Sequence, residues 1–336
     1  MSLEHLNPKS WQRRKKPSSQ EVFEKLRKGD ISALSRAITG VESKASEDYA
    51  FAKALLQQAL PFSGNSFRLG ITGVPGVGKS TFIESLGIHL IKLGFKVAVL
   101  AIDPSSSVSK GSILGDKTRM EQLVKSEFAY IRPSPAGETL GGVARKTREA
   151  ILLCEAAGFD FIMVETVGVG QSETAVHSMT DFFLLLKLAG AGDDLQGIKR
   201  GIMEMADAVI INKADGDNKK AALHARREFQ NALHLINPKS HQYPVKVHLC
   251  SGLHNEGIEE IAQEIASFRQ HSNQNGSLLE RRNSQELYWL HQTIEDRLKE
   301  AFYSRSEIVN QIKEIETSVV NRKISAFDAA DRLLSL

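Results

Sequence analysis

The stretch 68–81, read as RLGITGVPGVGKST, constrains the fold of this chain more than any other segment. An apolar run leads directly into a loop that fits the pattern G-x-x-x-x-G-K-[ST], and a helical segment, 80–93, follows it. Glycines at fixed positions let successive backbone N–H groups point inward around phosphate oxygens, and the helix adds its positive N-terminus. A strand, loop and helix in this order predict a parallel α/β sheet with a nucleoside triphosphate site at its carboxyl edge.

Short apolar runs recur after this motif and predict the rest of the sheet. They lie at 68–73, 96–103, 128–133, 159–166, 181–188, 207–215 and 245–252. Most lack the period-2 alternation of a half-exposed strand, which favours strands buried on both faces. Helical segments such as 80–93 and 142–157 separate them. The fold class is therefore α/β, with a doubly wound, mostly parallel sheet.

Helical segments flank this region on both sides. Ser18 and Glu21 form a capping-box pattern, with helical periodicity to Val41 and a further helix expected over 47–60. After a polar segment, 271–277, apolar residues return at helical spacing. The expected organisation is a disordered basic tail over 1–17, a helical element over 18–62, a P-loop domain over 63–270, and a linker with a helical arm over 271–336.

Composition argues against several kinds of partner. The 43 Lys and Arg residues nearly balance the 40 Asp and Glu residues, which does not favour a nucleic-acid binder. No uncharged apolar run reaches the roughly 20 residues needed to cross a bilayer. The two cysteines, Cys154 and Cys250, give no disulfide framework and no metal-ligand spacing. We therefore expect no nucleic-acid or membrane partner, and a cytoplasmic location, or the mitochondrial matrix in a eukaryote.

The loop itself supplies the candidate phosphate ligands. Lys79 is expected to reach the β- and γ-phosphates, and the Ser80 hydroxyl to bind Mg²⁺. The expected contacts to nucleotide are Gly73, Val74, Pro75, Gly76, Val77, Gly78, Lys79, Ser80 and Thr81.

A second motif, Asn212-Lys213-Ala214-Asp215, indicates which base is bound. The Asp215 carboxylate can accept hydrogen bonds from guanine N1–H and N2–H₂, whereas adenine would leave it unpaired, a mismatch that can reject a ligand by about 10⁴-fold. Asn212 would steady the loop. Cys250, Ser251 and Gly252, after the last predicted strand, would support the base with main-chain groups. The sequence thus predicts GTP and GDP as ligands.

Acidic residues near the ends of predicted strands are the candidate metal ligands. Asp103 and Glu165 each end a strand, and Asp116 lies in the loop GSILGDKTRM. With Ser80 they can hold Mg²⁺ directly or through water. Asp116 is also a candidate catalytic residue.

The segment after Glu165 resembles the D-x-x-G switch of common GTPases, with Glu in place of Asp. The Gly168 N–H could sense the γ-phosphate. No glutamine follows Gly168 directly, and Gln171 is a candidate for orienting water by proximity alone. We therefore expect slow hydrolysis by the chain itself.

The loop 188–202, LAGAGDDLQGIKRGI, combines glycines with charges of both signs. It follows a predicted sheet strand, so it should emerge at the same edge as Glu165 and Asn212. Lys199 in this loop is a candidate to reach the nucleotide or a partner subunit.

These motifs together resemble the MeaB/ArgK family of the SIMIBI class of GTPases. The resemblance rests on GVPGVGKST, AIDPSS, GSILGDKTRM, VETVGVGQSE, AGAGDDLQGIKRG and NKADGD, and it covers the chain beyond residues 1–17. It implies a homodimeric, Mg²⁺-dependent GTPase that acts as chaperone to an adenosylcobalamin-dependent acyl-CoA mutase, typically methylmalonyl-CoA mutase, on a separate chain. It also implies that the loop 188–202 is a third switch and that the C-terminal helices are a dimerisation arm.

Two other functions remain open at the level of sequence. An older label in this family describes an ATPase or kinase linked to basic amino-acid transport, which conflicts with guanine recognition by Asp215. A metal-delivery GTPase of the same class is the other alternative, although such proteins usually carry Cys and His clusters that this chain does not show.

Overall fold

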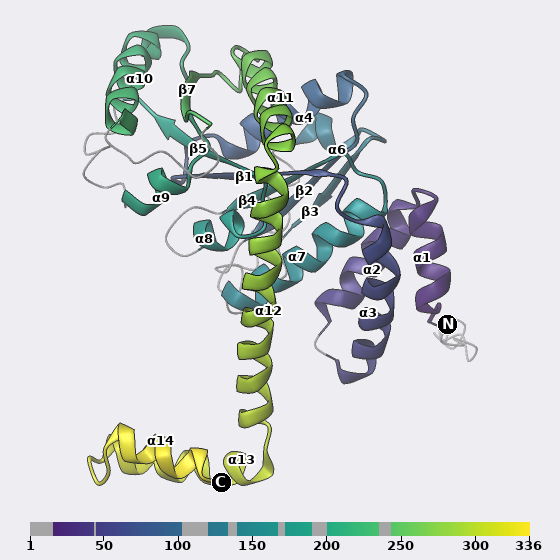
Figure 1. Ribbon diagram of the computed structural model, residues 1–336, viewed down its shortest axis with the longest axis vertical. Helices are drawn as coiled ribbons and strands as arrows, with labels where there is room; N and C mark the ends of the chain where they lie inside the picture. Colours follow the sequence, from purple (N-terminus) through teal and green to yellow (C-terminus); the bar gives the residue numbers. More distant parts are fainter. Residues whose placement is uncertain are drawn as a thin grey trace, which may run out of the picture. The chain divides into compact units, whose positions relative to one another are not determined.

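The computed structural model describes residues 16–43, 45–102, 120–133, 140–166, 172–189, 200–234 and 243–336 (Figure 1). The chain divides into two units, Met1–Leu279 and Glu280–Leu336. The first contains the sheet and the helices around it, and the second is helical.

The first unit is built on one sheet of seven strands in the order β3-β2-β4-β1-β5-β6-β7. All of its neighbouring strands are parallel. The strands are β1 Phe67–Gly73, β2 Val97–Ile102, β3 Ala129–Arg132, β4 Phe161–Thr166, β5 Phe182–Leu188, β6 Ala208–Asn212 and β7 Lys246–Leu249. The predicted parallel α/β fold is confirmed, and the carboxyl ends of all strands meet at one edge.

Helices connect the strands and cover the sheet. In the first unit they are α1 Ser19–Arg27, α2 Ile31–Glu42, α3 Ser46–Ala59, η2 Leu60–Phe62, α4 Lys79–Lys92, α6 Glu121–Val124, α7 Leu140–Ala156, α8 Ser172–His177, α9 Arg200–Met205, η4 Gly216–Asn218, α10 Lys219–His234 and α11 Ile258–Gln274. The predicted helices at 80–93 and 142–157 correspond to α4 and α7. Helix α12, Ser277–Tyr303, leads into the second unit, which continues with α13 Ser306–Val320 and α14 Ala326–Leu334. None of the described helices is both long and apolar enough to cross a membrane.

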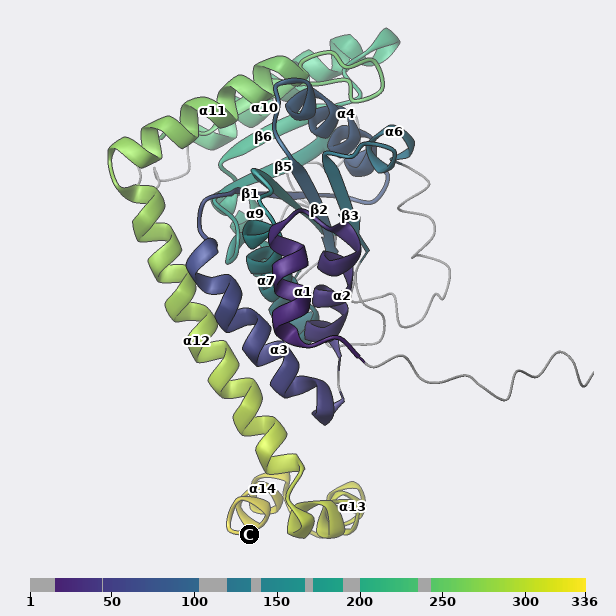
Figure 2. The same cartoon turned by 90° about the vertical axis from the view of Figure 1, so that its right-hand side faces the viewer.

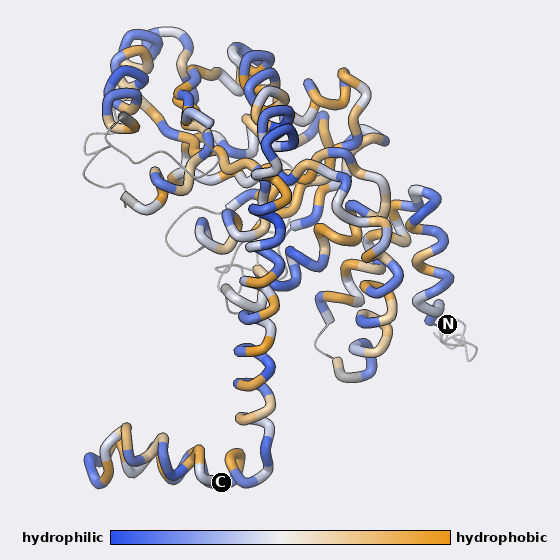
Figure 3. Tube along the Cα trace, viewed as in Figure 1, coloured by the Kyte–Doolittle hydropathy of each residue, from blue (hydrophilic) through white to orange (hydrophobic). Residues whose placement is uncertain are grey.

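The core lies on both faces of the sheet, which explains why the strands read as continuous apolar runs. Leu69 and Ile71 of β1 are fully buried in the layer that α4 and α11 cover. Leu185 of β5 and Val209 of β6 face the other way, toward α10. Figure 2 shows α4 and α11 on one side of the strands and α7 on the other. The strands carry the most hydrophobic colours of the first unit in Figure 3.

The N-terminal helices pack on α7. The Ser18–Glu21 capping box is present, and α2 and α3 both contact α7. Arg132 at the end of β3 forms an ion pair with Glu42, and Lys146 of α7 donates to the Glu42 carbonyl oxygen. The helical element is thus tied to the carboxyl end of an edge strand.

The polar segment 271–277, which its composition predicts to be a linker, is mostly helical. Helix α11 continues through Gln274, so Asn275 and Gly276 alone separate it from α12. The polar side chains 271–274 continue a helix with a largely exposed face, and the break occurs at Gly276, whose φ of 79° favours glycine.

Candidate nucleotide site

The phosphate loop has the backbone conformation that its glycines predict. Gly76 and Gly78 have φ angles of 80° and 91°, in the left-handed region. At Gly73, with φ of 154°, a Cβ would lie 2.6 Å from the Leu186 carbonyl oxygen of β5. The loop therefore needs glycine both for its turns and for its close approach to the neighbouring strand.

Lys79 begins α4 and is held over this loop. It is 8% exposed, and its Nζ donates to the carbonyl oxygens of Gly73, at 2.7 Å, and Val74, at 3.3 Å. The ammonium group thus lies beside the N-terminus of α4, where phosphate oxygens bind in sites of this kind. This is the position that the predicted role requires.

The structure brings Ser80 and Glu165 together. The Ser80 Oγ lies 3.5 Å from Glu165 Oε1 at the end of β4. Hydroxyl and carboxylate oxygens next to a phosphate loop are the donors that Mg²⁺ prefers, so these two residues fit a magnesium ion. No group of three or more His, Cys, Asp or Glu residues that could hold a metal occurs within the described part of the chain.

Asn212, at the end of β6, links the phosphate loop to the loop that follows β7. It is 2% exposed, its Nδ2 donates to the Val77 carbonyl oxygen at 2.8 Å, and its Oδ1 accepts from the Gly252 N–H at 3.2 Å. Both hydrogen-bonding ends of the amide are therefore used to hold two loops together.

The Asp215 carboxylate is held by Ser251, whose hydroxyl donates to Asp215 Oδ2. Lys213 has a φ of 57°, a left-handed conformation that is uncommon for a residue with a side chain. The Ser251 backbone pairs with Glu256 in an isolated bridge, which closes the turn that carries it. The predicted base-recognition residues thus lie together at the carboxyl edge.

Cys250 holds the end of β6 through its backbone, and its side chain packs as a buried apolar group. Its N–H donates to the Ile211 carbonyl oxygen and its own carbonyl accepts from the Ala214 N–H, both at 2.9 Å. Burial raises the pKa of its thiol to about 12, so the side chain stays protonated and acts as an apolar residue.

Ser85 of α4 belongs to the site and was not predicted from the sequence. Its Oγ donates to the Gly252 carbonyl oxygen at 2.5 Å. Helix α4 and the loop after β7 are close here, since a Cβ on Gly252 would lie 3.1 Å from the Phe82 nitrogen. The signal in the sequence is a serine at a position of α4 that helical periodicity places between buried Phe82 and Leu86.

Several predicted site residues lie outside the described residues. These are Asp103 and Asp116 among the metal ligands, Gly168 and Gln171 after β4, and Lys199 in the loop 188–202. Their assignments stay predictions.

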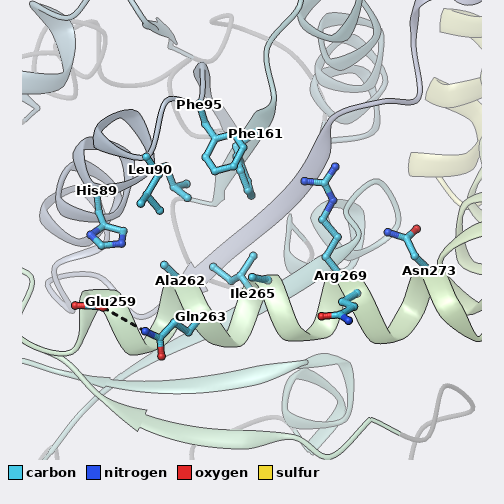
Figure 4. Close-up of a pocket in the computed structure, with 13 residues that line it drawn as sticks. His89, Leu90, Phe95, Phe161, Glu259, Ala262, Gln263, Ile265, Arg269 and Asn273 are labelled. Atoms are coloured by element: carbon cyan, nitrogen blue, oxygen red, sulfur yellow. Dashed lines mark hydrogen bonds between the residues drawn. The ribbon is translucent and has the colours of Figure 1, made fainter.

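A cavity of about 480 Å³ lies at the other edge of the sheet (Figure 4). It is lined by the C-terminal end of α4, by α11, and by Phe95 and Phe161, which lie at the amino ends of β2 and β4. Leu90 and Ile265 contribute further apolar surface. It contains neither the phosphate loop nor the guanine motif, so it is separate from the nucleotide site.

The sequence matches one protein family over most of its length. The model of the family described as "Methylmalonyl Co-A mutase-associated GTPase MeaB" matches residues 34–307.

Curated relatives extend this likeness. The chain is 50% identical to a putative GTPase of Caulobacter vibrioides over 307 residues, covering 91% of this chain and 94% of the relative. It is 45% identical to the GTPase ArgK of Escherichia coli over 305 residues, covering 91% and 92% of the two chains. It is 44% identical to the mouse mitochondrial methylmalonic aciduria type A homolog over 323 residues, covering 93% of this chain and 78% of the relative.

A solved structure agrees with these relatives. The crystal structure of an LAO/AO transport system kinase matches with a TM-score of 0.74 and 37% identity, covering 94% of this chain and 96% of that one.

Proposed function

Because the chain belongs to the methylmalonyl-CoA mutase-associated GTPase (MeaB) family and is therefore a GTPase, we propose that it acts as a nucleotide-dependent chaperone for an adenosylcobalamin-dependent acyl-CoA mutase. One observation supports the GTPase chemistry. Lys79, Ser80 and Glu165 lie at the carboxyl edge of the sheet, and Asn212 and Asp215 lie at the same edge. Phosphoryl transfer to water needs mainly positioning and charge neutralisation, which these groups supply.

Four residues would hold Mg²⁺ in this proposal: Ser80, Glu165, Asp103 and Asp116. The ion would neutralise charge on the phosphates. Lys79 would bind the β- and γ-phosphates from the N-terminus of α4, and Asp215 would bind the guanine edge while Ser251 keeps its carboxylate in place. Gly168, Gln171 and Lys199 are proposed to sense the γ-phosphate, orient water and respond to the partner.

The partner is proposed from the names of the relatives. The family description names methylmalonyl-CoA mutase, and the mouse relative is named for methylmalonic aciduria. The mutase would be a separate chain, and GTP or GDP in this site would set which form of the complex is stable. We infer that the chain works wherever its mutase works, in the cytoplasm of a bacterium or the mitochondrial matrix of a eukaryote.

Purified chain and mutase test this proposal directly. GTP turnover is measured for the chain alone and with the adenosylcobalamin-dependent mutase of the same organism, with and without its cofactor. We expect slow turnover alone and an increase of about tenfold or more with the mutase, as for a group supplied in trans. A rate that no form of the mutase changes, together with no co-elution in the presence of a GTP analogue or GDP, would falsify the chaperone role and leave the GTPase activity standing.

The helical arm over 271–336 is proposed to join two copies of the chain, while 18–62 supports the GTPase domain over 63–270. Leu287, Leu290, Ile294 and Leu298 lie three or four residues apart on α12 and are 60%, 53%, 45% and 65% exposed. Hydrophobic residues recur along this helix in Figure 3. A stripe of this kind is stable in water when a second helix covers it.

Light scattering measures the mass in solution and so tests whether two copies of the chain associate. The chain has a mass of 37.0 kDa, so a dimer has twice that, 74.0 kDa. A Leu290→Asp, Leu298→Asp variant should shift the mass toward 37.0 kDa, with nucleotide binding retained. A dimer unchanged by both aspartates would place the interface elsewhere.

The name of the solved relative raises the alternative of an ATPase or kinase linked to transport. The Asp215 and Ser251 arrangement favours guanine, because adenine has an acceptor at N1 and no amino group at C2, so it lacks the two neighbouring donors that guanine offers to the carboxylate. Displacement of bound GDP by ATP at a similar concentration would support the alternative.

A further inference from the structure

Two threonines at the carboxyl ends of β1 and β4 meet beneath the nucleotide site. The hydroxyl oxygens of Thr72 and Thr166 are 2.8 Å apart, and both residues are 0% exposed. Thr72 directly precedes Gly73, the first residue of the phosphate loop, and Thr166 directly follows Glu165. One hydrogen bond thus joins the strand residue just before the phosphate loop to the residue next to a proposed metal ligand.

The pair lies on the sheet face opposite α4. Ile71 belongs to the layer that α4 covers, and Glu165 reaches Ser80 of α4, so alternation along each strand turns Thr72 and Thr166 toward the other face. Neither hydroxyl can therefore touch a nucleotide held by α4. Any effect of the pair on the site acts through the backbone of β1 and β4.

The backbone pairing of these two strands ends just before the hydroxyl pair. The last register partners of β1 and β4 are Ile71 and Glu165, and the two threonines are the next residue on each strand. The side-chain hydrogen bond extends the connection between β1 and β4 by one residue, while the backbones of Thr72 and Thr166 stay paired with Leu185 of β5 and Ile102 of β2.

A hydroxyl pair fixes this distance in a way that an apolar pair cannot. Two hydroxyl oxygens in a hydrogen bond lie about 2.7–2.8 Å apart, whereas methyl groups in contact lie about 3.5–4.0 Å apart. Replacing either threonine by valine puts a methyl group where an oxygen was, and the ends of the strands must separate or rotate. Ser80 and Glu165 approach only to 3.5 Å, the outer limit of a hydrogen bond. A small displacement of Glu165 would therefore break this contact.

We propose that Thr72 and Thr166 are positioning residues that set the distance between Glu165 and Ser80, and through it the magnesium requirement of the GTPase. This inference rests on the proposed role of Glu165 in metal binding. Because the hydroxyl pair is remote from the base, its loss should leave guanine binding in the absence of metal nearly unchanged.

The test compares Thr166→Val with the wild-type chain in two binding measurements. Affinity for a fluorescent, non-hydrolysable GTP analogue is measured as a function of Mg²⁺ concentration, and GDP affinity is measured in EDTA. We expect the Mg²⁺ midpoint to rise by up to about tenfold, the range that loss of one buried hydrogen bond gives. GDP affinity in EDTA should change by less than about threefold. Steady-state GTP hydrolysis is a third measurement, in which kcat should fall more than KM rises, as for a transition-state interaction.

Conservative variants distinguish the effect of losing the hydroxyl from a general loss of stability. Thr166→Ser keeps the oxygen and should restore the Mg²⁺ midpoint, while Thr166→Ala should not. If Thr166→Val does not fold, the Ser and Ala pair decides the question alone. In the double variant Thr72→Val, Thr166→Val, the effects should be far from additive, because each single change already breaks the same bond.

Thr180→Val is the matched control. Thr180 is 1% exposed and donates to the Val176 carbonyl oxygen at 2.9 Å, near the amino end of β5. The Thr180→Val variant removes a buried threonine hydrogen bond far from the carboxyl edge, so it should lower thermal stability without moving the Mg²⁺ midpoint. An equal shift of the midpoint in Thr180→Val and Thr166→Val would overturn the proposal, as would a midpoint that Thr166→Val leaves unchanged.

Glu165→Gln tests the proposed metal ligand separately from the threonine pair. If this variant leaves the Mg²⁺ midpoint unchanged, the metal assignment itself is wrong. If it raises the midpoint and Thr166→Val does not, the metal assignment stands and the positioning role of the threonine pair is wrong.

Discussion

The base-binding side of the nucleotide site and its metal-binding side differ in how their parts are joined. On the base side, Asn212 bonds both the phosphate loop and the loop after β7, Ser251 holds Asp215, and Ser85 holds Gly252. On the metal side, Ser80 and Glu165 approach to 3.5 Å, the outer limit of a hydrogen bond. The base side is thus preorganised by the protein, and changes there should act on affinity and selectivity. Changes on the metal side should act on turnover.

The largest effect is expected from Lys79→Ala, which removes the cation of the phosphate loop. The ammonium group contributes charge that the transition state of phosphoryl transfer requires, so GTP turnover should fall by more than about a hundredfold. Phosphate release at saturating GTP measures this. Lys92→Ala, an exposed lysine at the other end of α4, is the control and should keep its full rate. Turnover above a tenth of wild type in Lys79→Ala would contradict the assignment.

Asp215→Asn should act on selectivity. The amide presents a donor to guanine N1–H and N2–H₂, so GDP affinity should fall by about 10³-fold, as for a buried polar mismatch. Xanthine carries an oxygen at C2, and XDP should bind this variant better than GDP does. Competition among GDP, XDP and ADP for a fluorescent nucleotide measures the order. Unchanged preference for GDP would mean that the base is read by other groups.

A smaller effect is expected from Ser85→Ala, because this side chain bonds the loop after β7 and belongs to neither the phosphate loop nor the guanine motif. Loss of its bond to the Gly252 carbonyl oxygen should lower GDP affinity by about fivefold to tenfold, the range of one buried hydrogen bond. Isothermal titration with GDP measures the change, and Mg²⁺ dependence should stay as in wild type. Ser272→Ala is the matched control, since Ser272 is 1% exposed and donates to the Phe268 carbonyl oxygen within α11. An equal loss of affinity in both variants would reduce Ser85 to a residue that stabilises the fold.

The parts of the site also differ in whether the sequence alone predicts them. The phosphate loop and Asn212 to Asp215 are local motifs, so their positions follow from a strand, a short loop and the next helix. Ser85 and the Thr72–Thr166 pair could not be found in this way. Helical periodicity can place Ser85 on the buried face of α4, but the partners are 167 and 94 residues away along the chain, and nothing in the local sequence identifies them.

The segment 271–277 shows that composition alone also does not predict where a helix ends. Polar composition predicts a linker there, but polar side chains on an exposed helix face do not end a helix. The break falls at Gly276, where the backbone takes a left-handed conformation that the neighbouring polar residues do not favour.

By itself, the sequence determined the fold class, the family and the motifs proposed to bind phosphate and guanine, because periodicity and glycine spacing act within a few residues of the chain. The tertiary structure alone decided which strand ends are neighbours. The order β3-β2-β4-β1-β5-β6-β7 places β4 beside β1, and so brings Glu165 to Ser80 and Thr166 to Thr72. Such contacts depend on the packing of strands remote in sequence, where a displacement of about 1 Å separates a bond from no bond.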